Sequence, residues 1–482
     1  MSDILERLRA LKQRKAGGAG PPDPAGSQPV PDEAPEPVKE RDPARQSTLD
    51  ALRAMIQTVR DRTGIECPVH SPNPGTNGVL SDEVFEGPGQ TIEDLIPGEC
   101  LQTPFGPCFR VRSEYPWQYH HGSVSIAETL DLTFNHLERF FPDERLHALN
   151  LNEALFFDTE TTGLDTGSGT YIFLAGFGYF EGRSFIVEQF FMRDFPEEPA
   201  VIDRVAALLA RFRFIVSFNG RTYDWPLLQS RFVMNRRVLP VSDPPHLDLL
   251  TLSRRLFRHT LDSCALSSLE QSVLGFHRID DLPGALLPGL FFKYQRSRDA
   301  RYIHKAFAHN AHDIVSMAAL LNHIARLMAE PLTWATEPSI LYAIGRIKAD
   351  QGDPSAAETF FRHALNQGLA TGLHRDALER LSLLLKDQQR WDEAVEVWNL
   401  MKRTGPPDVF PYIERAKRFE HGLKDYAAAI DEVREAMRIP DPRRFEDRRI
   451  LQELQHRLNR LEARAAGRAW RGDAGETDET TP

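Results

Sequence analysis

The sequence predicts an α/β domain in the middle of the chain, followed by a region made only of helices. Two observations carry this prediction. Between residues 151 and 330, short apolar runs of strand-like composition alternate with longer amphipathic segments. From about residue 337 the strand-like runs stop and helical periodicity continues to residue 440. We therefore expect a mixed sheet flanked by helices at 151–330 and an all-α domain at 337–440.

The α/β domain should contain at least four strands and three long helices. The expected strands are 154–160, 170–180, 184–191 and 214–218, and the expected helices are 201–212, 225–237 and 311–330. Three strands precede the first helix, which favours an antiparallel meander. The other strands should run parallel through helical crossovers, and this element order is similar to that of a ribonuclease-H-like sheet.

In the all-α region, helical pairs recur at a spacing of about 35 residues, which resembles the period of tetratricopeptide repeats. Three sets of residues repeat with the same internal spacing: Ala357, Phe361, Ala364; Ala394, Trp398, Met401; Ala429, Val433, Ala436. Small residues such as Gly345 would let the paired helices approach closely, although Ser382 and Lys417 take this place in the later units. A plain helical bundle is the alternative.

The remaining segments are expected to carry less structure. We expect residues 1–61 to be a disordered linker rich in Gly, Pro and charged residues. It begins with a short amphipathic stretch that has Ile4, Leu5, Leu8 and Leu11 on one face. That stretch is either a frayed helix or a helix that docks a partner. Residues 62–150 form an accessory region beside the α/β domain, and 441–482 form a helix and a disordered tail.

Composition excludes some classes of protein. Among 482 residues, 41% are apolar, and no run approaches the roughly 18 apolar residues of a membrane span. The first residues lack the apolar centre of a secretory signal, and four cysteines make no disulfide framework, so we expect a soluble, cytoplasmic protein. The net charge of -11 gives no overall attraction to nucleic acid, which would need a local basic patch or metal ions.

Two acids, Asp158 and Glu160, stand at the end of the first expected strand. Side chains alternate along a strand, so both carboxylates project to the same face. Two buried carboxylates this close repel each other, and both stay ionised readily only beside a cation such as Mg²⁺. For this pair taken alone, the alternative is that the two acids lie at an exposed end of a strand and bind no metal. The apolar residues on both sides of it favour a strand inside the sheet.

A site with two metal ions needs further oxygen ligands, and two more acids fit. Asp224 follows a strand and a turn at the start of an expected helix, where a helix-capping acid is the alternative. Asp313 lies on the helix 311–330, one turn after His309, where a solvated acid is the alternative. Asp248, Asp280 and Asp281 are interpreted as structural acids at a strand end and in a turn.

Together these residues resemble the DEDD superfamily of 3′–5′ exonucleases. The motifs that carry the resemblance are Asp158-x-Glu160, Phe218-Asn219-Gly220 with Asp224, and His309-x-x-x-Asp313. Within the superfamily, HLDLLTLSRRLF, SSLEQSVLGFHRIDDLPG and HNAHDIVSMAALL are most similar to the ribonuclease-H-like group of the YprB type. The resemblance covers about 151 to 330.

This resemblance implies a metal-dependent phosphodiesterase that acts on DNA or RNA. It implies two Mg²⁺ or Mn²⁺ ions, held by Asp158, Glu160, Asp224 and Asp313. It also implies that Thr161 and Asn219 lie near the substrate strand. The basic segments RFVMNRR and SRRLFRH are candidates to hold phosphates, with a solvated helix surface as the alternative.

The general base is where the sequence departs from the family pattern. DEDD enzymes usually place a Tyr four residues before the last Asp, or a His five before it, whereas His309 stands four before Asp313. On a helix this spacing puts both side chains on one face, so His309 is the expected base, and His312 points elsewhere. The alternative is that His309 is a packed histidine, or that it only orients a metal-bound carboxylate.

The predicted function is therefore a 3′–5′ exonuclease whose helical repeats dock a protein partner or extend the substrate path. The alternative is a scaffold that binds nucleic acid, turns over little and acts through its repeats. A zinc site from Cys67, His70, Cys100 and Cys108 is not favoured, because their spacing lacks paired C-x-x-C motifs.

Overall fold

The computed structural model describes residues 85, 87–131, 143–146, 150–163 and 169–467. All of them belong to one compact unit, Glu83–Pro482. The amphipathic stretch near the start of the chain, the expected linker 1–61, Cys67 and His70, and the end of the tail lie outside the described residues.

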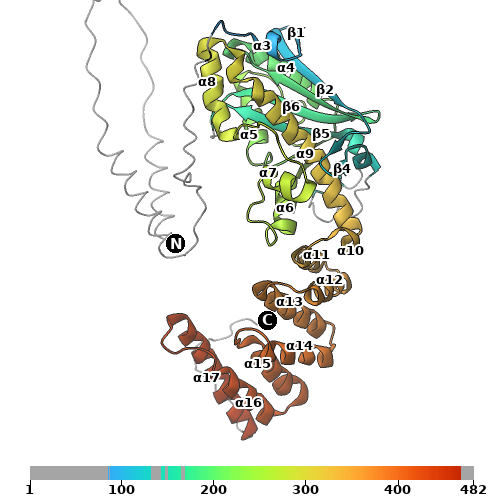
Figure 1. Cartoon of the computed structure of the whole chain (residues 1–482). Helices are drawn as coiled ribbons and strands as arrows, with labels where there is room; N and C mark the ends of the chain where they lie inside the picture. Colours follow the sequence, from blue (N-terminus) through green and yellow to red (C-terminus); the bar gives the residue numbers. More distant parts are fainter. Residues whose placement is uncertain (1–84, 86, 132–142, 147–149, 164–168, 468–482) are drawn as a thin grey trace, which may run out of the picture. The chain divides into compact units, whose positions relative to one another are not determined.

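A seven-stranded mixed sheet forms the centre of the α/β domain, in the order β1-β2-β7-β6-β5-β8-β9 (Figure 1). Its strands are β1 Glu99–Thr103, β2 Gly106–Tyr115, β5 Ala154–Thr161, β6 Ile172–Glu181, β7 Ser184–Phe191, β8 Phe214–Ser217 and β9 His246–Asp248. As predicted, β5, β6 and β7 form an antiparallel meander. Strands β8 and β9 run parallel to β5, because helical crossovers return the chain to the same end of the sheet.

Strands β1 and β2 extend this sheet beyond the strands expected from the sequence. Strand β2 pairs antiparallel with β7, with Phe109 opposite Phe191, and β1 pairs with β2. The edge of a sheet offers unpaired backbone groups, and β2 uses those of β7. Residues 99–115 are therefore part of the same sheet.

Helices cover both faces of the sheet, and the sheet separates two hydrophobic cores. Helix α9, His304–Ala329, packs against β5, β6 and β7 on one face (Figure 1). Phe156 belongs to the core on the α9 side. Phe157 belongs to the core on the other side, with α4 Glu198–Leu209, α5 Asp224–Met234 and α8 Leu287–Ser297. Alternation along β5 thus assigns odd and even residues to different faces.

Further helices complete the α/β domain and the helical region after it. Near the sheet lie α6 Leu249–Phe257 and α7 Leu266–Leu269, and α10 Pro331–Trp334 follows α9. The later helices are α11 Pro338–Asp350, α12 Pro354–Gln367, α13 Thr371–Asp387, α14 Trp391–Arg403, α15 Phe410–Lys417, α16 Tyr426–Ala436 and α17 Phe445–Ala465. The predicted fold class, a mixed sheet with helices followed by a helical region, is confirmed. Among the described residues, no helix combines the length and apolarity needed to span a bilayer.

The three repeated sets of residues lie on α12, α14 and α16, and all nine side chains are buried. Consecutive helices pack as the pairs α11 with α12, α13 with α14, and α15 with α16. Gly345 of α11 faces Phe361 of α12 so closely that an added Cβ would lie 2.8 Å from the ring. The small residue is therefore required by this helix contact.

Candidate active site

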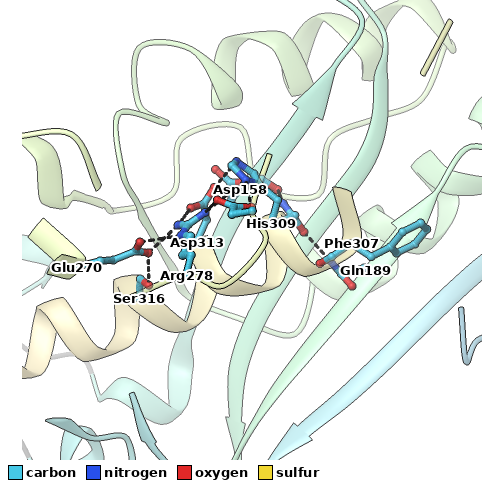
Figure 2. A network of polar contacts seen from close by, with 10 residues as sticks. Asp158, Gln189, Glu270, Arg278, Phe307, His309, Asp313 and Ser316 are labelled. Carbon is cyan, nitrogen blue, oxygen red and sulfur yellow. Dashed lines mark hydrogen bonds and ion pairs between the residues drawn. The ribbon is translucent and has the colours of Figure 1, made fainter. Parts of the chain in front are cut away.

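The acids of β5 face helix α9. Asp158 and Glu160 share the face of Phe156, which packs under α9. The amide of Asn310 on α9 donates to Asp158 Oδ2 at 2.8 Å and to its backbone oxygen at 3.3 Å. Asn310 is fully buried, and its own Oδ1 accepts from Gln189 of β7 at 2.9 Å. A chain of hydrogen bonds through α9 and β7 thus fixes Asp158 (Figure 2).

Glu160 lies in a second group of side chains with His309 and Asp313 of α9. One potential ligand atom from each residue lies within 4.8 Å of the others. His309 and Asp313 are one helical turn apart, with Nε2 of the first 3.5 Å from Oδ2 of the second. The predicted spacing therefore places these two side chains together beside Glu160. The carboxylate of Asp158 is not part of this closest group.

Asp224 approaches from the opposite face of β5, as the first residue of α5. It accepts a hydrogen bond from Thr159 Oγ1, and its side chain is buried. It nevertheless lies close enough to affect the ionisation of both β5 acids. The charges of all four predicted acids thus interact near the end of β5, but only Glu160 and Asp313 belong to the close group with His309.

The predicted substrate residues lie beside this end of the strand. Thr161 donates to the backbone oxygen of Gly163 at 2.7 Å, and Tyr223 donates to the same oxygen at 2.7 Å. Asn219 is exposed in the loop before α5 with a left-handed φ of 66°. Its backbone N–H donates to Asp248 at 2.9 Å. Asp248 thus holds this loop, in keeping with its interpretation as a structural acid.

The electrostatics of the site favour a bound cation. Burial raises the pKa of Asp158 well above its usual range, and the neighbouring carboxylates of Asp313 and Asp224 raise it further. Burial and the same two neighbours raise the pKa of Glu160. Burial also raises the pKa of Asp224 to about 6, against the hydrogen bond from Thr159. Without a bound metal ion the raised pKa values favour the protonated forms of these acids, and a metal ion would favour their ionised forms.

His309 has a partner that the sequence did not assign to the site. Its Nδ1 lies 2.9 Å from Oδ1 of Asp281, which precedes α8 in the chain. Nη1 of Arg278, which only donates, lies farther from the same nitrogen, at 3.3 Å. The shorter contact, to a carboxylate oxygen that accepts, therefore favours a proton on Nδ1. Nε2 then faces Oδ2 of Asp313, 3.5 Å away, a separation that suits a metal ion bound by both atoms.

Arg278 and Glu270 form the second unassigned part of the site. The guanidinium of Arg278 donates to Glu270 through Nε at 2.7 Å and Nη2 at 2.6 Å. It also contacts Asp313 through Nη2 and Asp281 through Nη1, at 3.1 Å for the latter. These residues were missed because a single Arg in FHRIDD and a Glu on a helix carry no signal until the fold brings them together.

The donor set suits divalent metal ions. Carboxylate oxygens from β5 and α9, with one imidazole, are ligands that Mg²⁺ and Mn²⁺ accept. The raised pKa values of Asp158 and Glu160 point the same way, because uncompensated carboxylates are unfavourable in a buried site. The residues therefore fit metal binding, and Asp158, Glu160, Asp224 and Asp313 are the candidate ligands.

Comparison with known proteins agrees with this geometry. Residues 155–325 match a sequence-family model, RNase_H_2, that is described as RNase_H superfamily. Over 334 residues the chain is 28% identical to "Uncharacterized protein YprB" of Bacillus subtilis (strain 168). That alignment covers 68% of this chain and 80% of the relative. Residues 155–325 thus form an RNase H superfamily domain, the type of domain found in hydrolases that process nucleic acids.

Proposed function

We propose that this protein is a metal-dependent 3′–5′ exonuclease of the DEDD type, with residues 151–330 as its catalytic domain. The observation that carries the proposal is the convergence of Asp158, Glu160, Asp224 and Asp313 at the end of β5, with raised pKa values for the first three. Glu160 and Asp224 are buried and Asp158 is half-buried, and the mutual repulsion and lost solvation of carboxylates so placed oppose folding. A bound metal ion would offset this repulsion, and we therefore assign the acids a role as metal ligands.

In this proposal the residues of the site have separate roles. The four acids hold two Mg²⁺ or Mn²⁺ ions, which would lower the pKa of a bound water and stabilise the leaving 3′ oxygen. Nε2 of His309 accepts the proton of the attacking water, and Asp281 keeps the imidazole in the required tautomer. Thr161 and Asn219 border the path of the substrate strand.

The test is hydrolysis of end-labelled DNA and RNA, single- and double-stranded, with Mg²⁺ or Mn²⁺. We expect products that shorten from the 3′ end, and we expect loss of all metal-dependent release with Asp158→Ala combined with Glu160→Ala. Asp262→Ala is the matched control, because Asp262 is an exposed acid of the same domain. Cuts within the strand would reject the exonuclease assignment while leaving the metal site in place.

The helical region supports a second candidate, a nucleic-acid-binding scaffold with little turnover. We propose that residues 337–440 are tetratricopeptide-like units, on the support of the buried repeated positions of α12, α14 and α16. A cavity of about 320 Å³ opens between α13 and α14, lined in part by His374, Arg375 and Met401. A protein partner would dock there. Wild-type chain that binds nucleic acid but releases no nucleotide from any substrate would favour this candidate.

A further inference from the structure

Arg278 is a buried cation fixed beside the candidate metal ligands. Its side chain is 8% exposed, and that of Glu270, its main partner, is 1% exposed. Two hydrogen bonds, from Nε and Nη2, join the guanidinium to both oxygens of Glu270. A bidentate pair of this kind defines the plane and direction of the guanidinium as well as its position.

Glu270 is itself held in place by a further series of hydrogen bonds. Ser316 of α9 donates its hydroxyl to Oε1 of Glu270, and His121 lies with Nε2 2.7 Å from the same hydroxyl oxygen. Burial lowers the pKa of His121 to about 3, so its imidazole is neutral. It therefore donates from Nε2 to Ser316 and accepts at Nδ1 from Tyr119, 3.2 Å away. This line of bonds leaves Glu270 little freedom to move (Figure 2 shows its end at Ser316 and Glu270).

The nitrogens of Arg278 are all engaged by the protein. Nε and Nη2 bind Glu270, Nη2 also binds Asp313, and Nη1 lies 3.1 Å from Asp281. A guanidinium in this state has no free edge for a substrate phosphate. Its remaining effect is on Asp313, whose Oδ1 it occupies while Oδ2 faces His309.

We infer that Arg278, braced by Glu270, is a positioning residue that fixes the carboxylate of Asp313, so that one oxygen is retained by the guanidinium and the other is presented to a divalent ion beside Glu160. The inference deepens the proposed function and rests on it. Asp313 then supplies one oxygen to the metal site in a set orientation. The planar fork of arginine is essential to this role, since lysine carries the same charge as a point donor.

The experiment is a titration of the metal-free full-length chain with Mn²⁺, followed by calorimetry and by the electron paramagnetic resonance of free Mn²⁺. The variants are Arg278→Lys, which keeps the charge, Arg278→Gln, which removes it, and Glu270→Gln, which removes the brace. Arg254→Lys on the exposed side of α6 is the matched control. Because supporting residues of metal ligands typically contribute 10- to 100-fold in affinity, we expect at least tenfold weaker Mn²⁺ binding for Arg278→Lys and Glu270→Gln.

Three results would overturn the inference. If Arg278→Lys binds Mn²⁺ like the wild type while Arg278→Gln binds it more tightly, Arg278 acts only as a nearby charge that opposes the metal. If Arg278 variants do not fold, Ser316→Ala tests the brace without removing either charged partner, and unchanged affinity there would reject it. A wild type that binds Mn²⁺ no better than Asp158→Asn combined with Glu160→Gln would instead overturn the proposed metal site, and the inference with it.

Discussion

His309 of α9 and Asp281 of the loop that precedes α8 are joined by a contact of 2.9 Å between Nδ1 and Oδ1. The two residues are 28 positions apart, so the contact depends on how the loop folds over the helix. It orients the ring and directs Nε2 toward Asp313. The pair has the form of a general base with a carboxylate that orients it, in which the carboxylate stabilises the imidazolium formed on proton transfer.

Substitution of either member of this pair should slow hydrolysis. We expect His309→Gln to lower kcat by about 10²- to 10⁴-fold, the usual contribution of a general base, and Asp281→Asn by a smaller factor. The double variant should be no slower than His309→Gln alone, because residues that act as a unit are not additive. The rate of nucleotide release in a single turnover, measured for all three variants and the wild type, checks this prediction. Additive losses would show that Asp281 acts independently of His309.

The metal-free protein should lose stability as pH rises through the site's raised pKa values. Burial raises the pKa of Asp224 from 3.8, the value of an exposed aspartate, to about 6, so the folded state binds more protons than the unfolded state between these values. Its stabilising contribution is fully present below pH 3.8 and is lost as pH rises through about 6. One pKa unit corresponds to 1.36 kcal/mol, so this residue accounts for about 3 kcal/mol of unfolding free energy.

Urea unfolding in EDTA at several pH values checks this prediction. Asp224→Asn, which mimics the protonated acid, should be more stable than the wild type near pH 7.5 and should show a flatter pH dependence. With saturating Mn²⁺ the order should reverse, because the ionised acid then has a cation to bind. Equal pH dependence of wild type and variant in EDTA would contradict the raised pKa of Asp224.

Local sequence patterns were sufficient to predict strand β5 and the shared face of its two acids. Asp158 and Glu160 end a strand whose alternation is visible in the sequence, and the spacing of His309 and Asp313 fixes their shared helix face. The pairing of β2 with β7 was not predictable in this way, since no local pattern specifies which distant strand completes an edge.

The supporting residues escaped prediction for a related reason. Asn310 carries no charge and stands next to His309 in the sequence, yet it is the residue that binds Asp158. Arg278 and Asp281 lie in a turn, where isolated charges are usually solvated. Only the packing of the segment 270–281 against α9 converts them into partners of the site. A buried network is a property of tertiary contacts, and single-sequence patterns carry little of it.

Gly176 of β6 should be required for the contact between Asn310 and Asp158. A Cβ at this position would overlap Asn310 Oδ1 and would lie 2.6 Å from Ile314 Cδ1. We expect Gly176→Ala to lower the unfolding free energy by about 1–3 kcal/mol, the usual cost of overpacking, and to weaken Mn²⁺ binding because Asn310 must move. Thermal unfolding and Mn²⁺ titration measure both effects.

The control for this change is Gly169→Ala, because an added Cβ there has no neighbour within 4 Å. It should leave Mn²⁺ affinity unchanged. If Gly176→Ala reduces stability but binds Mn²⁺ like the wild type, Asn310 does not position Asp158 for the metal.

The contact between Gly345 and Phe361 should determine the stability of the first helical pair. Alanine has a higher helix propensity than glycine by about 1 kcal/mol, so Gly345→Ala would stabilise α11 if the site were open. An added Cβ would instead lie 2.8 Å from the ring of Phe361, which is fully buried. We expect a net loss of about 1–3 kcal/mol, because the ring has no space into which to move. Gly372→Ala in α13, where an added Cβ meets nothing within 4 Å, should be neutral or slightly stabilising.

A double-mutant cycle separates the clash from other effects of Gly345→Ala. Phe361→Leu alone should destabilise the helical region, since it removes buried volume between α11 and α12. Combined with Gly345→Ala it should cost less than the sum of the two changes, because the smaller side chain leaves room for the new methyl group. Far-UV circular dichroism during urea unfolding reports the free energies. Strict additivity would mean that the two residues do not press on each other, and that the small residue in α11 is not set by the approach of α12.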